Sequence, residues 1–232
     1  MSAALQAILF DLDGTLLDND MEQFLSHYFR RLSNWMRHIM PPQEFIDHLM
    51  QATRVMMAND GRTTNEEVFA AAFYPLAGRP RKEIEPLLEQ FYAREFPHLR
   101  EHTRRRPEAR AVVQAALDRG YDLVVATNPL FPATAMWQRL EWAGVADLPF
   151  LLVTTYENSH ACKPNPIYFE QICATIGRPA ASCLMVGDDP MDMAAARIGC
   201  PTFFIAEGNN ELPPDMPTPS YRGTLADVTA LL

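Results

Sequence analysis

The chain has 232 residues, enough for one large domain or for a core domain with a smaller insert. Its 20 Lys and Arg residues against 29 Asp and Glu give a net charge of −9, which argues against a general affinity for nucleic acid or anionic membranes. No segment approaches the roughly 20 apolar residues of a membrane helix, and the N-terminal apolar run is too short for a signal peptide. We therefore expect a cytoplasmic protein, a monomer or homodimer, whose partner is a small molecule.

The first predicted strand covers residues 5–10 (LQAILF), a compact apolar run of the kind that a parallel sheet buries on both faces. Asp11 and Asp13 follow directly and oppose burial, and Gly14 comes next. Apolar residues then recur at helical spacing, and several such helical patterns follow one another to about residue 96. Residues 18–105 are therefore predicted to form an all-helical insert, in which Thr64 and Glu67 have the spacing of a capping box.

After the insert, helical patterns alternate with short apolar segments that read as strands: YDLVVA, FLLVTT, SCLMVG and TFFIA. This alternation predicts βαβ units and a parallel sheet. Residues 208–219 contain four prolines and are predicted to form an ordered loop before a terminal helix at 224–232. The predicted fold is thus α/β, with a doubly wound parallel-sheet core of residues 1–17 and 106–232 interrupted by the insert.

Polar side chains gather where the predicted strands end: Asp11 and Asp13, then Thr127 and Asn128, then Asp188, Asp189 and Asp192. The carboxyl ends of parallel strands meet at one edge of a sheet, so these side chains are expected to lie close together. Crowded carboxylates raise one another's pKa unless a cation is present. Because all the candidate ligands are hard oxygens, we expect that cation to be Mg²⁺.

The spacing of Asp11 and Asp13 suggests that the two carboxylates have different roles in one reaction. In extended backbone their side chains fall on the same side, roughly 6–7 Å apart. One carboxylate can attack phosphorus and form an aspartyl phosphate while the other handles the proton. Gly14 lets backbone N–H groups approach a phosphoryl group, Thr127 adds a hydroxyl donor, and Lys163 adds a compact positive charge.

Lys163 stands out because the chain has 18 arginines and only two lysines, Lys82 and Lys163. The four cysteines show neither a zinc-ligand spacing nor a redox CxxC pattern, and we predict that they are buried reduced thiols: Cys162, Cys173, Cys183 and Cys200.

The segments DLDGT, ATN, KP and GDDPMD, in this order, resemble the four motifs of the haloacid dehalogenase-like (HAD) superfamily. The resemblance spans the whole predicted core and implies a Rossmann-like fold. The position of the insert, between the first and second motifs, is similar to the helical cap of small-molecule phosphatases in that superfamily.

Carried over to this chain, the resemblance implies that Asp11 is the nucleophile and Asp13 the general acid/base. It implies that Mg²⁺ is held by the Asp11 carboxylate, the Asp13 backbone carbonyl and Asp188, while Asp192 acts through a water or through hydrogen bonds to the ligands. The role of Asp189 stays open. The residues that would bind the phosphate are Gly14, Thr127, Asn128 and Lys163.

Several reactions occur on such a core. Asp13 favours phosphoryl transfer over dehalogenation, because displacing a halide needs no acid at that position. A phosphonate-cleaving enzyme would need a cap lysine, and Lys82 lies at a helix start rather than in an evident pocket. A sugar-phosphate mutase and a non-catalytic HAD-like binding module remain as alternatives. The preferred prediction is a Mg²⁺-dependent phosphatase that hydrolyses a small phosphorylated metabolite.

Overall fold

The computed structural model describes residues 4–207 and 211–232 of the chain. Its main sheet has six parallel strands in the order β5-β4-β1-β6-β7-β8. The strands are β1 (Ala7–Phe10), β4 (Asp122–Val125), β5 (Leu152–Val153), β6 (Cys183–Gly187), β7 (Thr202–Ile205) and β8 (Tyr221–Gly223).

Strand β1 lies at the centre of the sheet, and its four residues are fully buried. It pairs with β4 on one side and β6 on the other, so that Phe10 lies opposite both Val125 and Val186. A strand covered on both faces needs apolar side chains pointing both ways, as the continuous run in the sequence provides. This register decides which residues stand together where the strands end.

Helices cover both faces of the sheet. Residues of α5 (Ala109–Asp118), α6 (Ala133–Ala143) and the 3₁₀ segment η5 (Ala226–Ala230) share one hydrophobic cluster with alternate strand residues such as Ile8. Residues of α7 (Pro166–Ile176) and the 3₁₀ helix η4 (Pro190–Ile198) share the cluster on the other face, with Leu9. The prediction of a doubly wound α/β fold is confirmed.

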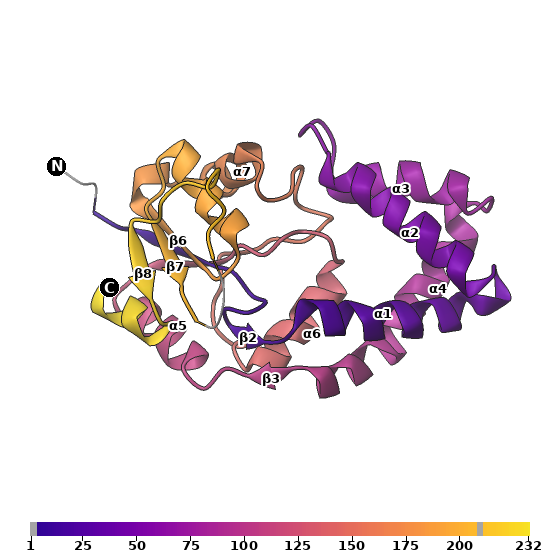
Figure 1. Cartoon of the computed structure of the whole chain (residues 1–232), viewed down its shortest axis with the longest axis horizontal. Helices are drawn as coiled ribbons and strands as arrows, with labels where there is room; N and C mark the ends of the chain where they lie inside the picture. Colours follow the sequence, from indigo (N-terminus) through magenta and orange to yellow (C-terminus); the bar gives the residue numbers. More distant parts are fainter. Residues whose placement is uncertain (1–3, 208–210) are drawn as a thin grey trace.

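The insert is built from helices and lies at the end of the molecule away from the two termini (Figure 1). It comprises α1 (Met21–Trp35), η1 (Met36–His38), α2 (Pro42–Met57), α3 (Asn65–Leu76), α4 (Arg81–Arg94) and η2 (Phe96–His102). The chain enters it through β2 (Leu17–Asp18) and leaves through β3 (Arg104–Arg105), and these two strands pair antiparallel. The predicted helical insert is therefore present, while the division into domains at residues 17/18 and 105/106 stays a prediction.

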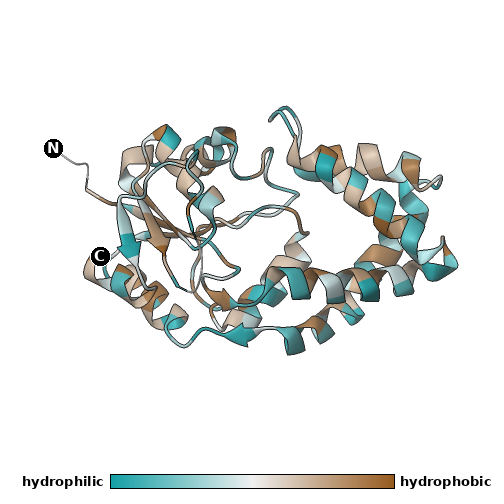
Figure 2. Cartoon of the chain, in the orientation of Figure 1, coloured by the Kyte–Doolittle hydropathy of each residue, from teal (hydrophilic) through white to brown (hydrophobic). Residues whose placement is uncertain are grey.

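Local sequence signals start the helices of the insert. Asp20 accepts hydrogen bonds from the N–H groups of Glu22 and Gln23 and so caps α1. The predicted capping box at α3 is confirmed, because Thr64 and Glu67 each accept the other's backbone N–H, at 3.2 and 3.1 Å. The helices of the insert alternate hydrophobic and hydrophilic residues, as amphipathic helices packed around a shared core do (Figure 2).

The structure differs from the prediction near the sheet edges. The strand predicted over FLLVTT is only two residues long, because the Asn158 side chain accepts the N–H of Thr155 and turns the chain away. Strand β8 was not predicted, since YRG has no apolar alternation and its first two residues are exposed. The predicted terminal helix is the short 3₁₀ segment η5, and part of the predicted proline-rich loop, residues 208–210, lies outside the described residues.

Candidate active site

The register of the central strands brings the predicted polar residues to one edge of the sheet. The Asp11 N–H donates to the carbonyl of Val186 at 2.9 Å, and the Ala126 N–H donates to that of Phe10 at 2.7 Å. A cavity of about 440 Å³ opens at this edge. Eight of the predicted residues line it: Asp11, Asp13, Gly14, Thr127, Asn128, Lys163, Asp188 and Asp189.

Lys163 connects two carboxylates at the buried end of the site. Its ammonium group donates to Asp11 Oδ1 at 2.7 Å and to Asp192 Oδ1 at 2.5 Å, and its side chain is only 2% exposed. Burial by itself would lower the pKa of Lys163, but the Asp11 and Asp192 carboxylates raise it above its ordinary value. Lys163 is therefore a fixed positive charge beside Asp11 at neutral pH.

Asp192 and Asp189 shape the start of η4. Asp189 accepts the N–H of Met191 at 2.8 Å, and Asp192 accepts the N–H of Asp189 at 3.2 Å, which forms a capping box. Asp192 is completely buried, and beyond Asp189 its contact with the other residues of the site is through Lys163. Asp189 lines the cavity, and its carboxylate serves the helix start.

Gly14 and Asp188 lie in close contact in the wall of the cavity. Gly14 has a φ of +76°, and a Cβ built on it would lie 2.1 Å from Asp188 Oδ2. The Thr15 hydroxyl donates to Asp188 Oδ1 at 2.8 Å. Burial, and next the charge of Asp11, raise the pKa of Asp188 to about 6. The absence of a side chain at residue 14 thus leaves the Asp188 carboxylate room to face Asp11.

The oxygen atoms at this edge fit a hard divalent cation. Within residues 4–207 and 211–232, no group of three or more acidic, His or Cys side chains has the arrangement of a metal site. The side-chain donors present are the carboxylates of Asp11 and Asp188, which the Asp13 backbone carbonyl can supplement. A ligand set of two carboxylates, one backbone carbonyl and waters suits Mg²⁺.

Asp13 has partners that the sequence analysis did not anticipate. Its carboxylate forms an ion pair with Arg139 and accepts a hydrogen bond from the Asn19 amide at 3.0 Å. Arg139 comes from α6, is 1% exposed, and lies 5.1 Å from the Phe24 ring centroid and 5.2 Å from that of Phe131. Burial lowers the pKa of Arg139 to about 10, so the guanidinium is still charged at neutral pH.

A signal for Arg139 was present in the sequence. Along α6 the buried residues Met136, Arg139, Leu140 and Ala143 recur at helical spacing, which places a charged residue on the apolar face. A buried arginine needs a carboxylate partner, because an unpaired charge inside a protein is costly. The carboxylates predicted at the strand ends, Asp13 among them, were candidate partners.

Thr127 and Asn128 continue from β4 into the cavity. Thr127 is 3% exposed, and its carbonyl accepts hydrogen bonds from Thr154 and Tyr168, both at 2.8 Å. Asn128 Oδ1 accepts the backbone N–H of Lys163 at 3.3 Å. These contacts fix the loop that carries the two predicted phosphate-binding side chains.

Arg106, at the junction where the insert rejoins the core, also supports the site. Its guanidinium donates to the carbonyl of Gly14 at 2.6 Å and pairs with Glu207. Arg104 and Arg105, the other two residues of this run of three arginines, are exposed, whereas the Arg106 side chain is only 14% exposed.

A family model described as haloacid dehalogenase-like hydrolase matches residues 5–198. The chain belongs to this family. It is 28% identical over 213 residues to phosphoglycolate phosphatase of Rhodospirillum rubrum, an alignment that covers 90% of this chain and 82% of the relative. It is 31% identical over 199 residues to N-acetylmuramic acid 6-phosphate phosphatase of Pseudomonas aeruginosa, covering 83% of this chain and 77% of the relative.

Solved structures show the same fold in this family. A HAD phosphatase from Thermococcus onnurineus superposes with a TM-score of 0.63 at 22% identity, covering 98% of this chain and 97% of that one. The L-2-haloacid dehalogenase of Xanthobacter autotrophicus superposes with a TM-score of 0.61 at 15% identity, covering 98% of both chains. The resemblance noted in the sequence motifs is confirmed.

This HAD-like chain is an enzyme, a phosphoric monoester hydrolase, in line with its phosphatase relatives. A non-catalytic binding module is therefore set aside. Among the described residues, no helix has the length and apolar content needed to cross a membrane.

Proposed function

We propose that this enzyme hydrolyses the phosphate monoester of a small metabolite, with Mg²⁺, through a phosphorylated Asp11. One observation carries the proposal: the Asp11 carboxylate lines the cavity 2.7 Å from the Lys163 ammonium, and Asp13 and Asp188 line the same cavity. A carboxylate nucleophile, a second carboxylate and a fixed positive charge are the groups that phosphoryl transfer through an aspartyl phosphate requires.

In the first step, an Asp11 carboxylate oxygen attacks phosphorus and the bond from phosphorus to the alcohol oxygen breaks. Asp13, in its protonated form, gives its proton to the departing alkoxide. Lys163 offsets negative charge at the nucleophile and the phosphoryl oxygens, and the Thr127 hydroxyl donates to a phosphoryl oxygen. The products of this step are the free alcohol and phosphorylated Asp11.

In the second step, Asp13 is ionised and takes a proton from a water that attacks phosphorus. The acyl phosphate bond breaks, inorganic phosphate leaves, and Asp11 returns as a carboxylate. Arg139 and Asn19 hold the Asp13 side chain through their contacts with its carboxylate. The geometry of Asp13 is thereby set by α6 and the start of the insert together.

The carboxylates of Asp11 and Asp188 and the backbone carbonyl of Asp13 would hold Mg²⁺. The close approach of Gly14 to Asp188 supports this, because any larger residue would displace that carboxylate. When bound, the ion neutralises negative charge on the phosphoryl oxygens and helps to orient the ester. This proposal leaves Asp189 as a helix-capping residue.

The curated relatives support a small-molecule substrate. Their names describe phosphatases of phosphoglycolate and of N-acetylmuramic acid 6-phosphate. A cavity of about 440 Å³ is of the size that encloses a small phosphorylated metabolite. We propose that the substrate of this chain is likewise a small phosphorylated metabolite.

The test is phosphate release from a panel of phosphorylated sugars, nucleotides, phosphoglycolate and p-nitrophenyl phosphate. We expect release in Mg²⁺, none in EDTA, and none from the Asp11→Asn variant. Asp118→Asn, which alters an exposed carboxylate at the end of α5, serves as the matched control. Release that persists in EDTA, or in the Asp11→Asn variant, would overturn the proposal.

A further inference from the structure

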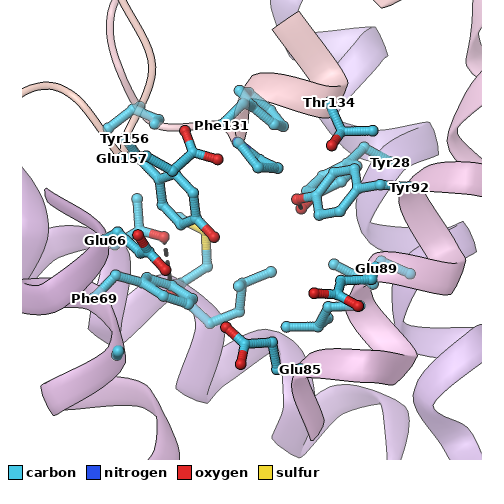
Figure 3. A pocket seen from close by; sticks show the side chains of 18 of the residues that line it. Tyr28, Glu66, Phe69, Glu85, Glu89, Tyr92, Phe131, Thr134, Tyr156 and Glu157 are labelled. Carbon is cyan, nitrogen blue, oxygen red and sulfur yellow. Dashed lines mark hydrogen bonds between the residues drawn. The ribbon is translucent and has the colours of Figure 1, made fainter. Parts of the chain in front are cut away.

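A second cavity, of about 420 Å³, lies beside the active site. Helices α1, α2, α3 and α4 form most of its wall, and the core closes it with residues 130–132, Thr134, Tyr156 and Glu157 (Figure 3). Leu130 and Phe131 line this cavity and the active-site cavity as well. The insert cavity is therefore next to the place where the phosphate ester would bind.

Aromatic rings make up much of the wall of the insert cavity. Tyr28, Phe69, Tyr92, Phe131 and Tyr156 come from three helices and two core segments and surround the opening (Figure 3). Tyr28 and Phe131 are 5.3 Å apart in a T-shaped arrangement, and the hydroxyls of Tyr28 and Tyr92 are 2.8 Å apart. This aromatic lining is fixed by its own packing, so it is formed before any ligand arrives.

The charged groups of the insert cavity are mostly negative. Glu66, Glu85, Glu89 and Glu157 line it, and Arg81 is the single positive residue among the described residues of the lining. Figure 3 shows these four carboxylates arranged around the opening.

The one positive charge is already paired. Arg81 forms ion pairs with Glu66 and Glu85, and its Nε donates to Glu85 at 2.7 Å. Glu157 accepts the backbone N–H of Ala133 at the start of α6, at 2.9 Å. Among the described residues, Glu89 has neither a hydrogen bond nor an ion pair. Four carboxylates and one guanidinium give this lining a net charge of −3, and Glu89 and Glu157 have no ion pair with a described residue.

We propose that the insert cavity binds the alcohol part of the substrate, and that this alcohol carries an amine or quaternary ammonium cation on an apolar body. The inference rests on the proposed phosphatase function and names its substrate class. A cation is attracted both by aromatic faces and by carboxylates, whereas an apolar body fills a space lined with rings.

The same cavity disfavours an anionic alcohol. A carboxylate such as that of glycolate would enter a region whose lining has a net charge of −3, and like charges at close range repel. Burial raises the pKa of Tyr74, whose ring also lines the cavity, to about 12, so that its hydroxyl is neutral at working pH. The ester's cation takes no part in the chemistry: Asp11 displaces the alcohol, which leaves with its ammonium group intact, and water then breaks the acyl phosphate.

Three phenyl phosphates that differ only at the para position test the proposal: 2-aminoethyl, propyl and carboxymethyl. At low ionic strength we expect kcat/KM for the aminoethyl ester to exceed that of the propyl ester by roughly tenfold, with the carboxymethyl ester the poorest. Glu89→Gln should lower the ratio of aminoethyl to propyl kcat/KM about threefold or more. Glu83→Gln, on the same helix and outside the cavity, should leave that ratio unchanged.

The outcomes separate the cavity's role from the enzyme's activity. Equal kcat/KM values for the three esters, or a preference for the carboxymethyl ester, would overturn the cationic substrate class and leave the phosphatase function standing. If no ester is hydrolysed, titration calorimetry that compares the affinities of tyramine and 4-propylphenol still tests whether the insert cavity prefers a cation. Binding of tyramine that weakens in Glu89→Gln supports the cavity's role, and equal affinity for the two phenols overturns it.

Discussion

The guanidinium of Arg139 forms an ion pair with the carboxylate of Asp13, which is the second carboxylate of the DLDGT segment. Arg139 lies on α6 of the core, between the rings of Phe24 and Phe131, and Phe24 belongs to the insert. One buried cation thus contacts the proposed acid/base, the core and the insert. This contact makes Arg139 a positioning residue for Asp13.

Replacing Arg139 should slow the chemical steps that depend on Asp13. For Arg139→Lys, which keeps the charge and loses the planar guanidinium, we expect kcat/KM for an alkyl phosphate, which reports on the step in which the alcohol leaves, to fall roughly 100-fold. The fall should be smaller for p-nitrophenyl phosphate, because its leaving group needs no proton. Steady-state kinetics with both esters measures the difference.

The matched control is Arg110→Gln. Arg110 is half exposed and pairs with Asp147 on the surface, so its loss should leave both rates unchanged. If Arg139→Lys lowered kcat/KM for the two esters equally, a role in positioning Asp13 as the acid would be contradicted.

Removal of Lys163 should destabilise the protein. Lys163→Met leaves the buried carboxylates of Asp11 and Asp192 without their shared partner, which we expect to cost about 3–5 kcal/mol of the free energy of unfolding in EDTA. Adding Asp192→Asn to that variant removes one of the two unpaired charges and should restore part of the loss. Urea denaturation of the two single variants and the double variant measures both effects. Strictly additive losses would show that the lysine and Asp192 do not interact.

Gly14→Ala should abolish activity through Asp188. The new Cβ meets Asp188 Oδ2 at 2.1 Å, so the carboxylate must move and affinity for Mg²⁺ should fall at least tenfold. Gly120→Ala is the control, because Gly120 has a similar φ of +82° with no atom within 4 Å of its Cβ. Both variants should lose about 1–2 kcal/mol of stability from the strained backbone, and only Gly14→Ala should lose Mg²⁺ affinity. Titration calorimetry with Mg²⁺ distinguishes them.

The cysteines should be unreactive in the native protein. All four are free and buried, as predicted, and burial raises the pKa of the Cys162 thiol to about 12. At pH 8 the thiol is therefore protonated, and we expect iodoacetamide to modify the native protein at least 100 times more slowly than the urea-unfolded protein.

The raised pKa of Cys162 also makes the free energy of unfolding depend on pH. The native state keeps the Cys162 proton above pH 9, where the unfolded chain loses it, so this group's contribution to the free energy of unfolding falls as pH rises from about 9 to about 12. In Cys162→Ala, the free energy of unfolding should therefore fall less steeply between about pH 9 and about pH 12. Urea denaturation over this pH range measures the slope, and an identical slope in the variant would contradict the raised pKa of Cys162.

Most residues of the candidate site could be predicted because they directly follow strands, and a strand can be recognised from a short stretch of sequence. Asp11, Asp13 and Gly14 follow an apolar run in the sequence, and the parallel register then brings Thr127 and Asp188 to the same edge. Lys163 and Asp192 could also be proposed as site residues from the sequence, since each follows a recognisable strand or loop. The sequence alone did not show that Lys163 joins Asp11 to Asp192.

The residues that were missed act across long sequence separations. Arg139 is 126 residues from Asp13, and Arg106 is 92 residues from Gly14. Helical periodicity identifies a buried face without saying what lies against it, so a partner on another element stays invisible. The insert cavity was missed for the same reason, because its acidic and aromatic residues come from separate helices and core loops.

In the proposed mechanism, the phosphoryl group passes through Asp11. The most direct measurement is borohydride trapping of Asp13→Asn protein after brief reaction with p-nitrophenyl phosphate and Mg²⁺, followed by peptide mass spectrometry. Asp13→Asn should slow the breakdown of the phosphorylated enzyme, and borohydride converts an acyl phosphate to homoserine. We predict homoserine at position 11 and nowhere else. Turnover without any label at position 11, or a label on another carboxylate, would contradict the account.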